Sequence, residues 1–236
     1  MEPGATAPEA SSRAAQFKKA KTFFRPQLSM LHDPFLMKDM NLAVDRVFKA
    51  YKQKDKVMLY GDYDVDGTTA VSLLFNNLNK HLNLIYYIPD RFNEGYGISK
   101  TGIDYAISKK INLIISLDCG IKSKKEISYA QENNIDFIVC DHHEVGDDIP
   151  TCIVLNPKQK DCNYPFDGLS GCGVGFKLLE GLYKQIGWDK KSLFSHLELV
   201  AISIAADMVP ISNENRILAF HGLSKLNSKP IRALKE

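Results

Sequence analysis

The sequence lacks any apolar run of the roughly 18 residues that a membrane-spanning helix needs. Its longest apolar-rich stretch, residues 197–209, is shorter and contains Glu198 and Asp207. An excess of charge of one sign is also missing, because the formal net charge of the 236 residues is only +2. A membrane-spanning protein is therefore not expected, and any polyanion must be bound by a local groove rather than by a generally basic surface.

Paired cysteines are missing as well. The sequence has five cysteines, an odd number, and no C-x-x-C motif. This argues against a disulfide scaffold or a structural zinc site and favours the reducing cytoplasm. No internal repeat or heptad pattern is present either.

The first 22 residues are rich in Ala, Pro, Ser and Glu and show no hydrophobic periodicity. They lack the apolar centre of a secretory signal, and Glu2 and Glu9 argue against a transit peptide. We therefore predict a disordered leader at 1–22 and one folded domain at 23–236.

Short apolar runs alternate with segments of helical periodicity from residue 41 to residue 155. This alternation predicts an α/β fold with a mainly parallel sheet flanked by helices. A helical subregion is expected to close the same domain, with helices at 175–186, 196–208 and 215–226. The expected strands are 57–60, 82–88, 111–117, 135–140 and 152–155, and the helices between them include 68–79 and 124–132.

Acidic and imidazole side chains gather where three of these strands stop. Ligands of open α/β sheets bind outside the carboxyl ends of the strands, so these side chains are expected to share one cleft. They are Asp62, Asp64 and Asp66 after the first strand, Asp118 after the third, and Asp141, His142 and His143 after the fourth. Asp207, which interrupts an apolar helical stretch, is expected to join them.

Three carboxylates within five residues repel one another, so their clustering favours a bound cation. Oxygen ligands with one imidazole suit Mn²⁺ or Mg²⁺ better than zinc. Carboxylates shared between two such ions are typical of enzymes that cleave phosphoesters, where the ions activate a water molecule. The sequence therefore predicts a two-metal site.

Simpler interpretations of the same residues remain open. An EF-hand calcium loop fits Gly67 at its sixth position but not Ala70 or Leu73 at its ninth and twelfth. A solvated acidic turn, a pair of surface histidines and an ordinary acid at a helix end are the structural alternatives.

A glycine-rich segment at 171–177 opens a predicted helix, where backbone N–H groups and Lys177 are able to meet a phosphate. The alternative is a turn that needs glycine for tight packing. Arg91, Tyr96 and Arg216 are weak signals for substrate binding when each is taken alone.

The whole set resembles the DHH phosphoesterase superfamily and, within it, the RecJ single-strand-specific exonucleases. The similar segments follow the family's order within residues 23–226. They are GDYDVDGTTA, PDRFNEGYGIS, SLDCGIKS, VCDHHE, GCGVGFKLLEGL and IAADMVPISNENRILA.

This resemblance implies two manganese ions, with magnesium as an alternative, and hydrolysis of single-stranded DNA from its 5′ end. The implied metal ligands are Asp64, Asp66, a bridging Asp118, His142 and Asp207. The implied catalytic residues are Asp62, Asp141 and His143, with His143 facing the scissile phosphate. The implied substrate-binding residues are Arg91, Tyr96, Gly173, Lys177 and Arg216.

RecJ-like proteins continue into a second, DHH-associated domain and usually carry an OB-fold, and neither is expected in these residues. We therefore expect the catalytic DHH domain alone, either as an excised core or as a natural short form. The resemblance implies single-stranded DNA, a single-strand-binding protein and a helicase as partners. Two other functions stay open: hydrolysis of oligoribonucleotides or cyclic dinucleotides, and an inactive metal-bearing module that binds DNA or a protein.

Overall fold

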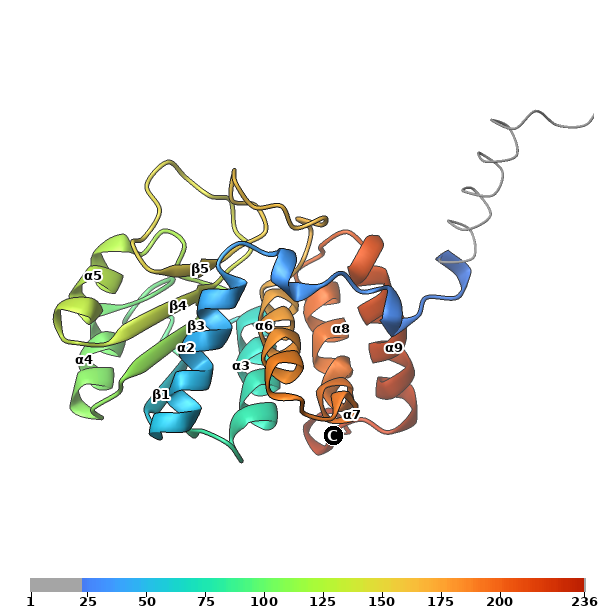
Figure 1. Ribbon diagram of the computed structural model, residues 1–236, viewed down its shortest axis with the longest axis horizontal. Coiled ribbons are helices and arrows are strands. Elements are labelled where there is room, and N and C mark those ends of the chain that lie inside the picture. The colour runs from blue at the N-terminus through green and yellow to red at the C-terminus, as the bar shows by residue number, and fades with distance from the viewer. Residues whose placement is uncertain (1–22, 236) are drawn as a thin grey trace, which may run out of the picture.

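The computed structural model describes residues 23–235, and the expected leader at 1–22 lies outside them. A five-stranded parallel sheet forms the centre, with strand order β2-β1-β3-β4-β5 (Figure 1). This confirms the predicted α/β fold. The strands are β1 (Lys56–Gly61), β2 (Asn83–Tyr87), β3 (Leu113–Leu117), β4 (Asp136–Cys140) and β5 (Ile153–Leu155).

Helices cover both faces of the sheet. One face packs against α4 (Lys100–Ser108) and α5 (Lys124–Glu132), and the other against α2 (Met40–Gln53), α3 (Val65–Leu78) and α6 (Gly171–Ile186) (Figure 1). The C-terminal subregion contains α7 (Lys190–Leu193), α8 (Leu197–Ala206) and α9 (Asn213–Ser228). Short 3-10 helices are η1 (Leu28–Met30), η2 (Pro34–Leu36), η3 (Phe194–His196) and η4 (Arg232–Leu234). Of the helices within 23–235, none combines the length and apolar character required to span a membrane.

Burial on both faces explains why the strands are continuous apolar runs rather than alternating ones. Successive side chains of β1 enter different cores: Val57 and Leu59 belong to the cluster under α2, α3 and α6, whereas Met58 and Tyr60 belong to the cluster under α4 and α5.

Two helices begin earlier than the sequence pattern predicts. Helix α3 begins at Val65, and Asp64 caps it by accepting a hydrogen bond of 2.9 Å from the Gly67 N–H. Helix α6 begins at Gly171, with Ser170 as its cap. The acidic run therefore divides between a turn and a helix, and the glycine-rich segment is the first turn of α6 rather than a loop.

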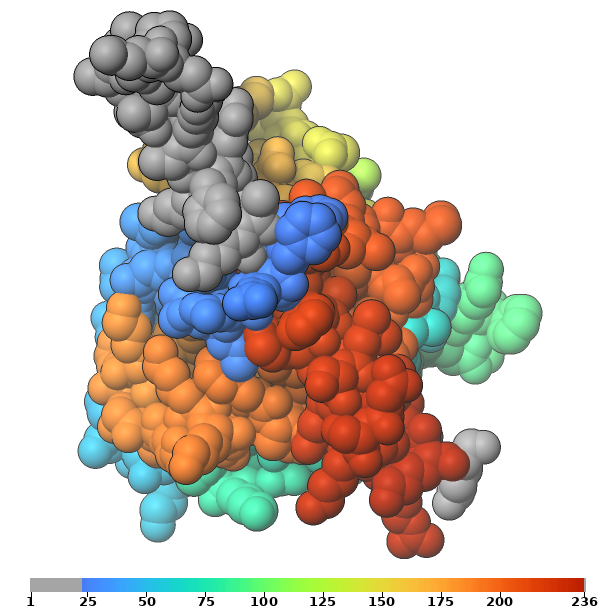
Figure 2. All heavy atoms as spheres, turned by 90° about the vertical axis from the view of Figure 1, so that its right-hand side faces the viewer, coloured from blue at the N-terminus to red at the C-terminus, as the bar shows by residue number. Residues whose placement is uncertain are grey.

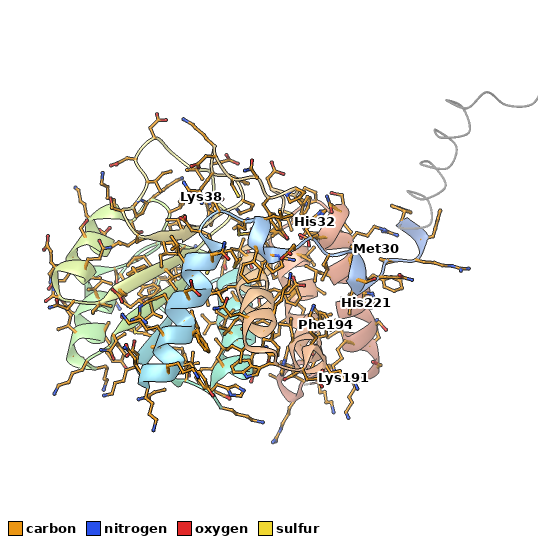
Figure 3. All side chains as sticks on the ribbon, viewed as in Figure 1. Met30, His32, Lys38, Lys191, Phe194 and His221 are labelled. Carbon is orange, nitrogen blue, oxygen red and sulfur yellow. The ribbon has the colours of Figure 1, made fainter. Side chains whose placement is uncertain are left out.

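The N-terminal segment of the described chain, residues 23–38, lies across α6 and α9, as Figure 2 shows from that side of the molecule. The His32 N–H donates to Glu214 at 2.7 Å, and the Lys177 ammonium donates to the His32 carbonyl at 2.7 Å. His221 of α9 contacts the Pro26 carbonyl at 3.2 Å, and Figure 3 labels His32 and His221 on this side. Residues from the two ends of the described chain therefore pack together.

The strand order places a topological switch point between β1 and β3. From β1 the chain moves to β2 on one side and then crosses to β3 on the other. The carboxyl ends of strands at such a switch point are the usual ligand position in open α/β sheets.

Candidate active site

Three aspartates continue the hydrogen-bond ladder of the sheet one residue beyond the strands. The N–H of Asp62 donates to Leu117, that of Asp118 to Cys140, and that of Asp141 to Leu155, at 3.3, 2.9 and 3.0 Å. Because β1, β3, β4 and β5 are adjacent and in register, the three acids form a row across the sheet edge. The structure thus brings together acids that are far apart in sequence, as the strand pattern predicted.

The side chain of Asp118 points out of this row, toward the centre of the site. Its φ of 63° is left-handed, which turns the side chain away from the strand direction, and it is only 1% exposed. Gly67 makes the approach of the neighbouring loop possible, because a Cβ atom there would lie 2.5 Å from the Asp62 carbonyl oxygen. Tight backbone packing therefore brings α3 against the row.

The imidazole of His142 faces three carboxylates. Its Nε2 lies 3.1 Å from Oδ1 of Asp118, 3.5 Å from Oδ2 of Asp207 and 3.7 Å from Oδ2 of Asp66. These side chains come from four separate elements: the loops after β3 and β4, the first turn of α3 and the end of α8.

Three sets of side chains have ligand atoms within 4.8 Å of one another. Asp118 and His142 each belong to two of the sets, so the sets are contiguous rather than separate sites. They are Asp62, Asp64 and Asp118; Asp66, His142 and Asp207; and Asp118, His142 and His143. Asp62, which we expected beside the ligands, stands in one of these sets.

The electrostatics of the centre fit a divalent cation. Oδ1 of Asp118 and Nε2 of His142 are buried and lie 3.1 Å apart, but neither makes a hydrogen bond of acceptable geometry within residues 23–235. Burial, followed by the charges of Asp66 and Asp64, raises the pKa of Asp118 to about 10. An unpaired buried carboxylate and imidazole are costly on their own, and a cation bound between them would satisfy both.

Asp66 is held by the N-terminus of α6. Its carboxylate accepts hydrogen bonds of 2.7 Å from the N–H groups of Gly171 and Cys172 and from the hydroxyl of Ser203. Burial nevertheless raises the pKa of Asp66. The first N–H groups of α6 therefore bind a protein carboxylate rather than a substrate phosphate. Of the two interpretations of the glycine-rich segment, the structure favours tight packing, because Gly171 lies directly against Asp118.

Ser203 is a residue of the site that the sequence pattern did not predict. It contacts both Asp66 and the Ser170 hydroxyl, at 2.7 and 2.6 Å. The available signal was its position, because a serine within the apolar run of α8 stands four residues before Asp207 and so shares its helix face.

His143 is oriented by Asp141 and lies beside Tyr96. Oδ1 of Asp141 is 2.7 Å from Nδ1 of His143, and the Tyr96 hydroxyl is 3.2 Å from Nε2. The hydrogen bond with Asp141 raises the pKa of His143 although burial opposes it. Burial would raise the pKa of Asp141, but hydrogen bonds from His143 and from the Ile121 N–H lower it below its usual value.

The expected substrate-binding residues divide into two groups. Tyr96 touches the site through His143, and the Arg91 guanidinium lies 5.2 Å from the ring of Tyr63, next to the acidic row. Gly173 is buried in α6, where its N–H donates to the Ser170 side chain. Gly173 therefore takes part in capping α6. Of these three residues, Tyr96 and Arg91 lie near the exposed side of the site.

Lys177 and Arg216 have partners within the protein. The Lys177 side chain is 0% exposed and forms ion pairs with Glu180 and Glu214, so the prediction that it meets substrate is wrong. The Arg216 guanidinium donates to the Phe23 carbonyl and lies 3.7 Å from the Phe23 ring centre. Arg216 therefore holds the N-terminal segment on α9.

Comparison with known proteins identifies the class that this fold and site define. Residues 56–204, more than half of the chain, match the model of the DHH family, N-terminal domain. The chain therefore belongs to the DHH family.

The relatives come from one branch of that family. The single-stranded-DNA-specific exonuclease RecJ of Bacillus subtilis is 39% identical over 221 residues, which is 93% of this chain and 27% of that protein. The RecJ of Escherichia coli is 35% identical over 202 residues, covering 80% of this chain and 35% of that protein. The chain thus spans about a third or less of the length of these two curated relatives.

A solved structure agrees with the fold. A crystal structure of Thermus thermophilus RecJ in complex with Mn²⁺ matches with a TM-score of 0.77 and 26% identity, over 91% of this chain and 30% of that chain.

Proposed function

We propose that this chain is the metal-dependent phosphodiesterase core of a 5′→3′ single-stranded-DNA exonuclease. The observation that carries the proposal is the contiguity of the three ligand sets through Asp118 and His142. Contiguous sets suit two ions that share a carboxylate, as two-metal phosphodiesterases require. The similarity to RecJ proteins supports the substrate class.

The donor set favours Mn²⁺ or Mg²⁺, because the three sets offer mainly carboxylate oxygens, with the imidazoles of His142 and His143 and no thiolate. Asp62, Asp64 and Asp118 would hold one ion, and Asp66, His142 and Asp207 would hold the other. Asp118 would be the carboxylate next to both, because its Oδ1 lies 3.1 Å from Nε2 of His142. Two such ions, when bound, would lower the pKa of a water molecule and offset the charge that develops on the phosphate.

The remaining residues position the reacting groups. Asp141 fixes the ring of His143 through Nδ1, so we assign Nε2, on the side of Tyr96, to the scissile phosphate. Tyr96 contacts that nitrogen and Arg91 lies over Tyr63, and these two contacts support a role for both at the entrance for substrate. We assign proton transfer or phosphate contact to His143 and entry of the strand to Tyr96 and Arg91.

The cellular setting follows from the same proposal. A nuclease that trims single strands acts where DNA is unwound, so a single-strand-binding protein and a helicase are the partners we infer. Five free cysteines among the described residues fit the cytoplasm.

A manganese-dependent nuclease assay on strands labelled at the 5′ or the 3′ end tests the proposal. With the 5′-labelled strand, we expect the label to appear at once in a mononucleotide. Asp118→Asn is expected to release no mononucleotide from either strand. Equal cleavage by wild-type protein and Asp118→Asn, or cleavage without any divalent ion, would contradict it.

A further inference from the structure

A cavity of about 460 Å³ adjoins the candidate active site on the side of α4 and α5. Its walls are residues 96–98, residues 120–123 with Glu126, and the pair Asp141 and His143. The cavity therefore opens directly onto the histidine that we assign to the scissile phosphate. None of the residues that line it belongs to α3 or α8, which carry Asp66 and Asp207.

The size and lining of this cavity suit a nucleoside. Small-molecule sites occupy roughly 300–1,000 Å³ and combine apolar walls with a few polar groups. Tyr96, Ile98 and Ile121 supply the apolar surface, and Ser123 and Glu126 supply hydrogen-bonding groups. Gly97 keeps the space open, because a side chain there is disfavoured by its φ of 83° and its Cβ position faces the Ser123 hydroxyl at 3.7 Å.

One lysine at the rim of this cavity, Lys122, is not held in an ion pair within the described residues. Two other lysines of this surface are paired: Lys158 with Glu144 at 2.9 Å, and Lys124 with Asp148. Lys122 is exposed and forms no ion pair with any acid in the part of the chain that the structure describes. Its ammonium is therefore available to an anion at the mouth of the cavity.

We propose that this cavity binds one nucleoside of the strand, next to the phosphate that is hydrolysed, and that Lys122 pairs with the following phosphate. The inference rests on the proposed function and adds a subsite with named walls. A base enclosed between Tyr96, Ile98 and Ile121 cannot pair with a complementary base. Selection of single strands is then a property of this domain itself.

Binding of a trinucleotide that contains 2-aminopurine tests the subsite, with Ca²⁺ replacing Mn²⁺ and the absence of cleavage verified. Fluorescence titrations over a range of salt give the affinity and its salt dependence. Lys122→Ala is expected to weaken binding about threefold to fivefold, the size of one solvent-exposed ion pair. It is also expected to reduce the salt slope by about 0.7, the value for one phosphate contact on a single strand.

Three further variants sharpen this experiment. Ser123→Tyr places a ring in the cavity and is expected to weaken binding about tenfold or more. Lys122→Arg keeps the charge and is expected to restore the salt slope. Lys125 is the matched control, because it is exposed on the same surface but does not line the cavity. Lys125→Ala is expected to change neither affinity nor slope, and thermal melting verifies the fold of every variant.

The proposal is overturned if the wild-type protein fails to alter the fluorescence, if Lys122→Ala and Lys125→Ala weaken binding equally, or if Ser123→Tyr binds normally. Failure of the proposed function has a different signature. It would appear as no manganese-dependent hydrolysis of bis(4-nitrophenyl) phosphate, a diester without a nucleoside, by the wild-type protein.

Discussion

Gly171 lies against Asp118 so closely that a Cβ atom on the glycine would be 2.6 Å from both Cβ and Oδ1 of the aspartate. The first turn of α6 is therefore in contact with the central acid of the site, while its N–H groups bind Asp66. One helix end thus sets the spacing between two of the candidate metal ligands.

The two neighbouring glycines are predicted to differ in their tolerance of alanine. Gly171→Ala must push α6 away from Asp118, so we expect Mn²⁺ affinity to fall by about tenfold or more, as for other groups that orient ligands. At Gly173 a Cβ atom would meet its nearest neighbours at 3.4 Å, and we expect Gly173→Ala to bind Mn²⁺ normally. Calorimetric titration of both variants checks this, and equal losses would contradict it.

Asp118→Asn is predicted to leave the metal-free protein at least as stable as wild type. The folded-state pKa of Asp118 is about 10 and its ordinary value is 3.8, so between these limits the folded state binds the extra proton. Stability of metal-free protein should therefore fall as pH rises through this window. Asp118→Asn should flatten this dependence, melt no lower than wild type in chelator, and lose the stabilisation by Mn²⁺. Thermal melts across pH, with chelator or Mn²⁺, provide the measurement.

The adjacent histidines are predicted to separate metal binding from catalysis. His142→Gln removes the imidazole that faces three carboxylates, so Mn²⁺ should no longer raise the melting temperature. His143→Gln leaves two ligand sets intact and should keep that rise. Its turnover should fall by about 10²–10⁴, the range for a proton-transferring group. A His143→Gln protein with normal turnover would remove His143 from the mechanism.

Lys177 is predicted to matter for stability rather than for substrate. Lys177→Ala leaves Glu180 and Glu214 buried without their cation, at a cost of about 3–5 kcal/mol. Lys184→Ala breaks the exposed pair with Asp33 and should cost at most about 1 kcal/mol. Urea denaturation of the two variants measures the difference. Similar losses would show that burial of the Lys177 network adds nothing.

The sequence pattern located the sheet and the acids correctly because both depend on local features. Apolar strands covered on two faces are visible as continuous runs, and parallel strands bring their carboxyl ends to one edge. The strand pattern alone therefore predicts that Asp118 and Asp141 share a cleft, without knowledge of the strand order. The sequence pattern predicts helix α5 to the residue.

The errors arose where a residue's partner is distant in sequence. Lys177 follows a glycine-rich turn, which favours a phosphate contact, but its partner Glu214 is 37 residues away on another helix. The sequence likewise leaves two interpretations of the first N–H groups of α6 open, because Asp66, their acceptor, precedes them by more than 100 residues. Local spacing does not reveal which of two possible acceptors occupies a helix end.

The hydrogen bond between His32 and Glu214 joins residues 182 positions apart. During synthesis from the N-terminus, the segment around His32 cannot reach its native position until α9 has left the ribosome. Contacts of such long range also slow folding, because the entropy of closing the intervening chain must be lost first. The nascent chain therefore exposes the surface of α6 beneath this segment until α9 has been made, and chaperone binding should be concentrated in that interval.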